Sequence, residues 1–333
     1  MVFDLDFLRN NKLHLKLYLS RVLAYLDGLR DPSEIFFDAR AFNAFIFAGK
    51  SIVYFGKEID YTELLNKNFE KFLSKLLSHF FIINRILNFN VNSDSYFAEN
   101  DIDLNTKRIH AFGYTLLITN LAAIYSKDFC VKFVEYDGLK GYFQFLKDEN
   151  FVIKNKNSKI SDLTGTPLDI LDYITLNILS LSTLTCVEHK NLWIELDAVN
   201  TLLKIAKYKE SASLDAYITI LLVIDDKQIE NLDEIHIIVK KITLNLEQCK
   251  KDFENNKFER KPMQILFKSK LFDYQVHRMK GPNSIYTSVV LLLDCLSKLA
   301  VNDKIKNDLY FKYDVKSCLK SLLSKGISLN FFK

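Results

Sequence analysis

Apolar residues recur along most of the chain at the three- and four-residue spacing of amphipathic helices, in segments separated by polar breaks. One of the clearest stripes places seven apolar residues between Leu64 and Leu77. This spacing predicts helices over Asn11–Leu26, Ser33–Phe47, Tyr61–Leu87, Thr106–Tyr125, Lys127–Val134, Tyr136–Lys147, Leu168–Cys186, Lys190–Leu196, Asp197–Tyr208, Asp215–Asp225, Lys227–Asn231, Glu234–Lys251, Ser284–Ala300, Lys304–Phe311 and Asp314–Lys325. The pattern therefore predicts an all-α fold.

Polar segments without a sustained period interrupt these helices. We expect a break near Gly49–Gly56 and an Asn- and Asp-rich loop over Asn88–Asn105. Two longer inserts follow, a polar loop over Asp148–Pro167 and a charged insertion over Lys250–Pro282. Only 9 Gly and 4 Pro occur in the chain, which leaves few tight turns and favours long helices over many strands.

One set of apolar positions returns at long intervals, and its clearest copy is Leu181, Leu184, Val199, Leu202 and Leu203. The equivalent positions are Leu121, Ile124, Leu139, Tyr142 and Phe143 at −60; Leu221, Ile224, Val239, Ile242 and Thr243 at +40, of which four are apolar; and Leu296, Leu299, Val315, Cys318 and Leu319 at +115 or +116. The two inserts account for the intervals longer than 40. A self-similar unit of about 40 residues is typical of a stacked helical solenoid, whose usual work is binding.

The order of long helix, short helix and long helix in each unit resembles an armadillo-type repeat. Leu181-x-x-Leu184 closes the second helix, and Val199-x-x-Leu202-Leu203 forms the core of the third. The resemblance covers about 106–326 and reaches residues 1–90 by analogy. Glycines that open armadillo helices occur only at Gly138 and Gly141, so HEAT-type helix pairs are an alternative.

This resemblance implies an all-α, right-handed armadillo-like superhelical solenoid with two long inserted loops. It implies one helical repeat domain over residues 1–333, with divergent N-terminal helices in 1–90 and clearer repeats in 106–326. It also implies that the third helices line a concave groove. The polar residues expected there are Lys140, Gln144, Asn200, Lys204, Lys240, Lys316 and Lys320. Such a ladder could hold an extended acidic peptide. The alternative is a solvated helix face that keeps the chain soluble.

Charge, apolar runs and cysteines limit the classes of partner and the cellular compartment that we expect. The net charge of +4 comes from 45 basic and 41 acidic residues mixed along the chain, so we expect no nucleic-acid partner. No apolar run approaches the roughly 18 residues of a membrane span, so we expect no membrane insertion. The five cysteines are odd in number and form no CxxC pair, which indicates reduced thiols of an intracellular, cytoplasmic protein. An N-terminus with acidic residues instead of a basic start agrees with this expectation.

Catalytic patterns are scarce. The six His are isolated, and neither HExxH nor a phosphate-binding Gly-rich loop occurs. Asp225, Asp226 and Glu230 resemble a Mg²⁺ motif, but the spacing places Ile229 where a carboxylate is needed. We interpret Asp225 as a helix cap and Trp193, the only Trp, as a core residue. No enzyme activity, metal or cofactor is therefore expected.

The sequence thus predicts a protein–protein interaction module or scaffold that binds a partner or an extended peptide along a concave groove. An alternative is a regulatory, autoinhibitory repeat segment that acts on an enzyme or signalling domain of a longer or partner chain. An all-α enzyme with an apolar pocket is a third hypothesis, which no convergent set of titratable residues supports. The identity of the partner, the oligomeric state and the role of the inserts 148–167 and 250–282 stay open.

Overall fold

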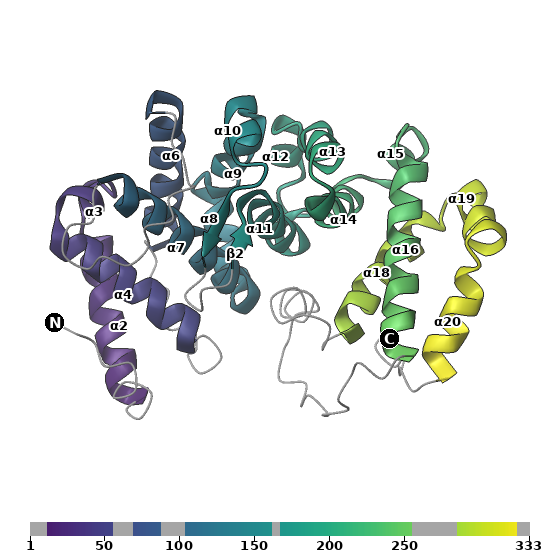
Figure 1. The fold of residues 1–333 in the computed structure, drawn as a ribbon, viewed down its shortest axis with the longest axis horizontal. Coiled ribbons are helices and arrows are strands. Elements are labelled where there is room, and N and C mark those ends of the chain that lie inside the picture. The colour runs from purple at the N-terminus through teal and green to yellow at the C-terminus, as the bar shows by residue number, and fades with distance from the viewer. Residues whose placement is uncertain (1–11, 56–68, 88–103, 162–166, 255–284, 325–333) are drawn as a thin grey trace. The chain divides into compact units, whose positions relative to one another are not determined.

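The computed structural model describes residues 12–55, 69–87, 104–161, 167–254 and 285–324 (Figure 1). Over these residues the chain is helical, apart from one short antiparallel pairing of two strands. The chain divides into two compact units, residues 1–201 and 202–333, and the division falls within a helix. The all-α class predicted from the apolar spacing is confirmed.

Unit 1 begins with helices rich in aromatic residues. These are α2 (Lys12–Asp27), α3 (Glu34–Phe37), α4 (Ala39–Phe55), α6 (Phe69–Leu87) and α7 (Leu104–Tyr125). α4 packs against α2, α3 and α7, and α6 packs against α2 and α7. Buried rings join these helices: Phe36 meets Phe80 at 5.6 Å between centroids, and Phe80 meets Phe112 at 5.3 Å. The aromatic residues therefore form a continuous core.

Two predictions in this region are wrong. The helix expected over Ser33–Phe47 is divided at Asp38, whose backbone is extended and whose Oδ1 accepts a hydrogen bond from the Arg40 amide at 2.6 Å. The break expected at Gly49–Gly56 does not begin there, because α4 continues through Gly49 to Phe55. Gly49 is buried, and a methyl group on it would lie 2.5 Å from the Tyr114 ring. The glycine thus permits the close approach of α7 and does not end the helix.

The second half of unit 1 contains shorter helices. They are α8 (Lys127–Glu135), α9 (Gly138–Lys147), α10 (Glu149–Lys154), α11 (Ile170–Thr185), α12 (Lys190–Glu195) and α13 (Ala198–Tyr208), which crosses into unit 2. α11 packs against α7, α8 and α9, and α9 packs against α6. Asn177 of α11 donates a hydrogen bond to the Leu116 carbonyl of α7 at 3.3 Å, within the buried α7–α11 interface.

The insert predicted as a loop over Asp148–Pro167 contains the helix α10 and a short strand. Asp148 caps α10 by accepting hydrogen bonds from the amides of Asn150 and Phe151, and Phe151 is buried against Phe145 at 4.8 Å. Strand β1 (Lys159–Ser161) then pairs with β2 (Pro167–Asp169). The loop prediction was wrong because the polar composition concealed one apolar anchor.

Unit 2 contains the end of α13, the 3₁₀ turn η1 (Glu210–Ala212), and α14 (Ser213–Val223), α15 (Asp226–Glu230), α16 (Ile235–Glu254), α18 (Ile285–Leu299), α19 (Asp303–Asn307), the π-helical turn η2 (Asp308–Lys312) and α20 (Val315–Ser324). α16 packs against α14, α18 and α20, and α14 packs against α18. Asp225 forms the predicted cap of α15, in a reciprocal capping box with Gln228. The expected loop 88–105 and insert 250–282 lie largely outside the described residues.

A left-handed aspartate stands before three of the helices predicted as third helices. Asp137, Asp197 and Asp314 have φ values of 66°, 47° and 44°, and they precede α9, α13 and α20. Aspartate tolerates this conformation better than most residues with a Cβ. The same left-handed conformation therefore occurs at three places that the sequence predicts to be equivalent.

The repeated apolar positions form much of the core. Leu139, Leu181, Leu202, Leu221 and Ile242 are fully buried. Trp193 is 1% exposed and meets the Phe143 ring edge-on at 5.9 Å, so its prediction as a core residue is confirmed. The solenoid arrangement and the single repeat domain over 1–333 stay predictions.

Candidate functional site

The candidate site lies on unit 2, where helices α13, α16 and α20 carry exposed lysines. Lys204, Lys240, Lys316 and Lys320 are all exposed, and we call them the lysine face. The helical spacing explains why these lysines are exposed, since the neighbouring apolar residues Leu203, Val239 and Cys318 are buried. The apolar stripe of each helix therefore fixes the direction in which its lysines point.

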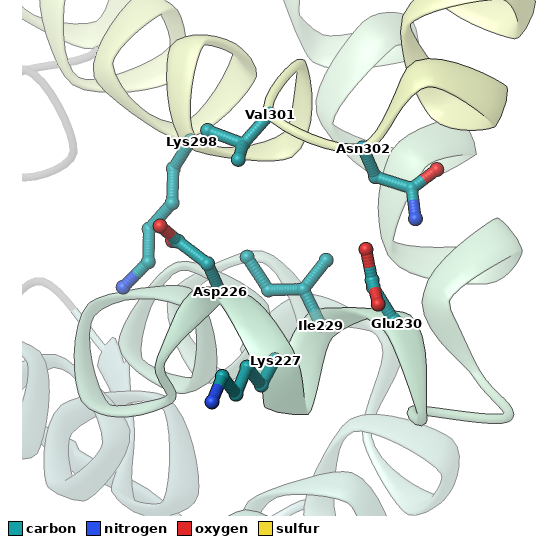
Figure 2. A pocket seen from close by; sticks show the side chains of 7 residues that line it. All are labelled: Asp226, Lys227, Ile229, Glu230, Lys298, Val301 and Asn302. Atoms are coloured by element: carbon teal, nitrogen blue, oxygen red, sulfur yellow. The ribbon is translucent and has the colours of Figure 1, made fainter.

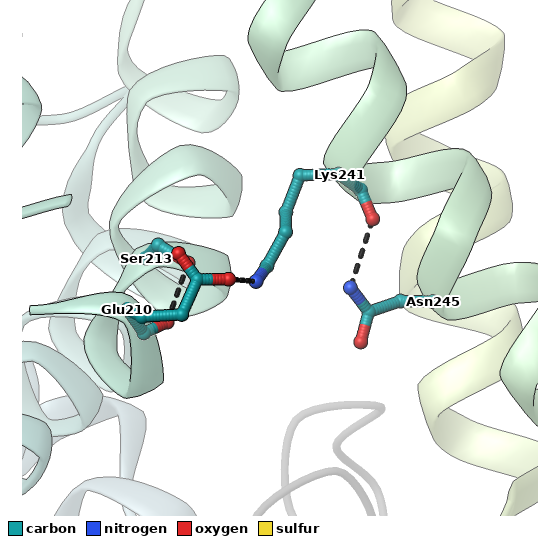
Figure 3. Close-up of polar contacts among 4 residues, drawn as sticks. All are labelled: Glu210, Ser213, Lys241 and Asn245. Atoms are coloured by element: carbon teal, nitrogen blue, oxygen red, sulfur yellow. Dashed lines mark hydrogen bonds and ion pairs between the residues drawn. The ribbon is translucent and has the colours of Figure 1, made fainter. Parts of the chain in front are cut away.

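Two ion pairs connect α13 and η1 to α16. Lys207 Nζ lies 2.7 Å from Glu234 Oε1, and Lys241 pairs with Glu210, as Figure 3 shows. Lys207 donates to Glu234 and thereby lowers the pKa of that carboxyl group and raises its own pKa. Because Lys207 and Glu210 are exposed to solvent, we expect each pair to contribute little to stability.

Helix α20 is held against α16 by apolar contacts. Ile242 and Leu246 of α16 and Cys318 and Leu322 of α20 are buried. The Cys318 thiol also donates to the Leu246 carbonyl at 3.8 Å. Lys240 on α16 and Lys316 and Lys320 on α20 are therefore carried by two helices in direct contact.

Lys316 also contacts an aromatic turn that the sequence did not identify as functional. Its Nζ donates to Tyr310 Oη at 2.9 Å and lies 5.0 Å from the centre of the Tyr310 ring. This hydrogen bond and the charges of Lys316 and Lys320 lower the pKa of the Tyr310 hydroxyl. The adjacent Phe311 is 78% exposed. We call Tyr310, Phe311, Lys312, Lys316 and Lys320 the aromatic–lysine cluster.

The remaining predicted groove residues belong to unit 1. Lys140 and Gln144 lie on α9, exposed and half-buried respectively. Asn200 lies on α13 and is exposed, and its Nδ2 donates to Asp197 Oδ1 at 2.7 Å. The seven predicted residues are thus shared between the units, three in unit 1 and four in unit 2, and only the second group forms the lysine face.

Unit 2 also has a small hollow between α15 and the turn after α18. In Figure 2, Ile229 points into the gap, with Asp226 and Glu230 on either side of it. The hollow has a volume of about 90 Å³, well below the roughly 300 Å³ at which small-molecule pockets begin. Lys298 Nζ donates to the Ile224 carbonyl at 2.6 Å, so this amine is engaged by the fold.

No three His, Cys, Asp or Glu side chains within the described ranges lie close enough to hold a metal. None of the five cysteines forms a disulfide bond, and burial raises the pKa of Cys295 to about 12. No described helix combines the length and hydropathy that a bilayer crossing needs. Comparison of the chain with protein-family models, curated proteins and solved structures finds no match.

Proposed function

We propose that the chain is a protein-interaction module that binds an acidic, extended segment of a partner protein on the lysine face of unit 2. The observation that carries the proposal is the exposure of four lysines on α13, α16 and α20. Two of these helices, α16 and α20, pack together, and the ion pair of Lys207 with Glu234 joins α13 to the residue that precedes α16. Carboxylates of an extended peptide could pair with successive lysines while the helices provide a fixed spacing.

Charge and desolvation favour this partner over a small molecule. Lysine is a flexible point charge and does not provide the planar fork that reads phosphates or bases, whereas it pairs readily with carboxylates. The exposed lysines need little desolvation before they bind. We expect each contact to be weak and sensitive to salt, so affinity comes from several contacts along one segment.

The test uses fluorescence anisotropy of a labelled twelve-residue peptide of alternating Glu and Gly. Lys204→Glu/Lys240→Glu should weaken binding at least tenfold in 50 mM NaCl, because two attractive contacts become repulsive. The control Lys227→Glu/Lys304→Glu changes the net charge equally, in the same unit, at exposed lysines of α15 and α19. If both variants lose affinity to the same degree, the effect comes from overall charge and the lysine face is refuted.

A further inference from the structure

The π-helical turn η2 places two large aromatic side chains in solvent next to lysines. Tyr313 N donates to the Asp308 carbonyl at 3.1 Å, the five-residue bond of a π turn. Within this turn only Leu309 is buried, while Phe311 is 78% and Tyr310 48% exposed. π turns are uncommon and occur often at functional sites. An exposed pair of aromatic residues on such a turn calls for an explanation beyond folding.

The two aromatic rings contact each other, and Lys316 contacts Tyr310. The rings of Tyr310 and Phe311 meet edge-on, with centroids 4.8 Å apart at 72°. Lys316 fixes Tyr310 further by its hydrogen bond to the hydroxyl and its position over the ring. A partner that contacts Phe311 would therefore lose little conformational freedom of this surface on binding.

The lysines around the pair give the surface a positive character. Lys312, Lys316 and Lys320 follow one another at intervals of four residues, and all three are exposed. From Tyr310 to Lys320 the chain carries these three lysines against one acidic residue, Asp314. Charge complementarity thus favours an acidic occupant, and the exposed phenylalanine favours an apolar residue within it.

We propose that the aromatic–lysine cluster is the anchor point for an acidic protein segment that carries one aromatic or large aliphatic residue between its carboxylates. The apolar residue packs on Phe311 and the edge of Tyr310, and the flanking carboxylates pair with Lys312, Lys316 and Lys320. This inference rests on the proposed function and names the feature that its peptide must carry.

A single-stranded nucleic acid is the less favoured occupant. Lysines and aromatic rings also bind single strands, but there the bases stack on open ring faces. Lys316 lies over the Tyr310 ring, and Phe311 meets that ring edge-on, so the two rings offer no stacked platform. The small net charge of +4 adds no general attraction to a polyanion.

The experiment compares two labelled peptides by anisotropy with the full chain, the Glu–Gly peptide described above and the same peptide with one central Phe. We expect the Phe peptide to bind about tenfold more tightly, which corresponds to burial of one aromatic side chain. Phe311→Ser should remove this advantage and leave the affinity for the Glu–Gly peptide unchanged. The matched control Ile237→Ser removes a 39% exposed apolar residue from α16, and it should leave the advantage intact.

Lys316→Gln and Lys320→Gln should weaken both peptides several-fold, with smaller losses in 500 mM NaCl. Equal affinity of the two peptides, or an advantage that survives Phe311→Ser, overturns the anchor while the proposed function stands. Failure of both peptides to bind refutes the proposed function itself. Displacement of the Phe peptide by a twelve-nucleotide single strand at lower concentration than by unlabelled peptide also overturns the anchor, in favour of a nucleic-acid surface.

Discussion

Two carboxyl groups in unit 1, the buried Glu70 and the partly buried Asp27, lead to the sharpest prediction about stability. Glu70, in the first turn of α6, is 5% exposed, and Asp27 is the last residue of α2, which packs on α6. Within the described residues, Glu70 Oε2 and Asp27 Oδ1 have no hydrogen-bond partner. Burial raises the pKa of Glu70 from 4.5 to about 7, and the charge of Asp27 adds to this rise. Burial alone raises the pKa of Asp27 from 3.8 to about 6.

The sign of the effect on stability follows from these pKa values. Between pH 4.5 and about 7 the folded chain keeps a proton on Glu70 that the unfolded chain has lost. The contribution of Glu70 to stability is therefore greatest below pH 4.5 and is lost as the pH rises through 7. An upper limit of this loss is about 3 kcal/mol. Relaxation and partial hydration reduce it, so we expect roughly 1 to 3 kcal/mol.

Glu70→Gln tests this reasoning, because the amide keeps the volume of the side chain and carries no charge. At pH 8 the variant should be more stable than the natural chain by about 1 to 3 kcal/mol, and near pH 4.5 the two should be similar. Urea unfolding at several pH values measures the difference. The fluorescence of Trp193 reports on unit 1, because Trp193 is the single Trp of the sequence and is buried in α12.

The difference in stability between the natural chain and the Glu70→Gln variant separates the effect of Glu70 from that of the other titrating groups. His79 contributes a slope of opposite sign, because desolvation lowers its pKa. The control Glu195→Gln removes an exposed carboxylate from α12 and should change stability by less than about 0.5 kcal/mol. A Glu70→Gln variant that is less stable than the natural chain at pH 8 would show that Glu70 is a favourable anion, and the argument from burial would be wrong.

Two further substitutions test how the helices pack. Gly138→Ala should destabilise unit 1 by about 1 to 3 kcal/mol in urea unfolding, because the new methyl group would overlap the buried Phe133 ring. The control Gly28→Ala changes an exposed glycine and should cost far less stability. Equal losses of stability in the two variants would contradict the overlap. Lys298→Met should lower the stability of unit 2 by about 1 to 2 kcal/mol, because the Ile224 carbonyl loses its 2.6 Å hydrogen bond. An unchanged urea midpoint in circular dichroism would show that this bond contributes nothing.

Most helices could be predicted from the sequence because their buried residues recur at the three- and four-residue spacing of a helix. Leu139, Leu202 and Ile242, which the repeated spacing predicted as apolar anchors, are all fully buried, so the spacing identified core positions. Errors arose where distant packing decided the outcome. Gly49 is needed because the Tyr114 ring of another helix lies close to it. The residues next to Gly49 in the sequence do not reveal this contact. Asp38 ended a helix within a run of aromatics through its side-chain hydrogen bond, a signal that could have been read as a cap.

The candidate site was foreseen only in part. The lysines of the third helices could be predicted, since each follows an apolar anchor that must face inward. The aromatic turn could not, because the run Tyr310-Phe311-Lys312-Tyr313 looks like an ordinary amphipathic helix until the extra residue of the π turn is seen. The pairing of Asp27 with the buried Glu70 was also missed, since the two residues are 43 positions apart and only the packing of α2 on α6 brings them together.

The π turn has a consequence for how this surface could arise or disappear. A π turn holds one more residue than an α-helical turn, and each residue of a helix rotates the chain by about 100°. Deletion of a single residue between Asp308 and Lys312 would let the turn relax to α-helix and would rotate Phe311 away from the lysines that follow. A lineage could therefore gain or lose the anchor through the insertion or deletion of one codon.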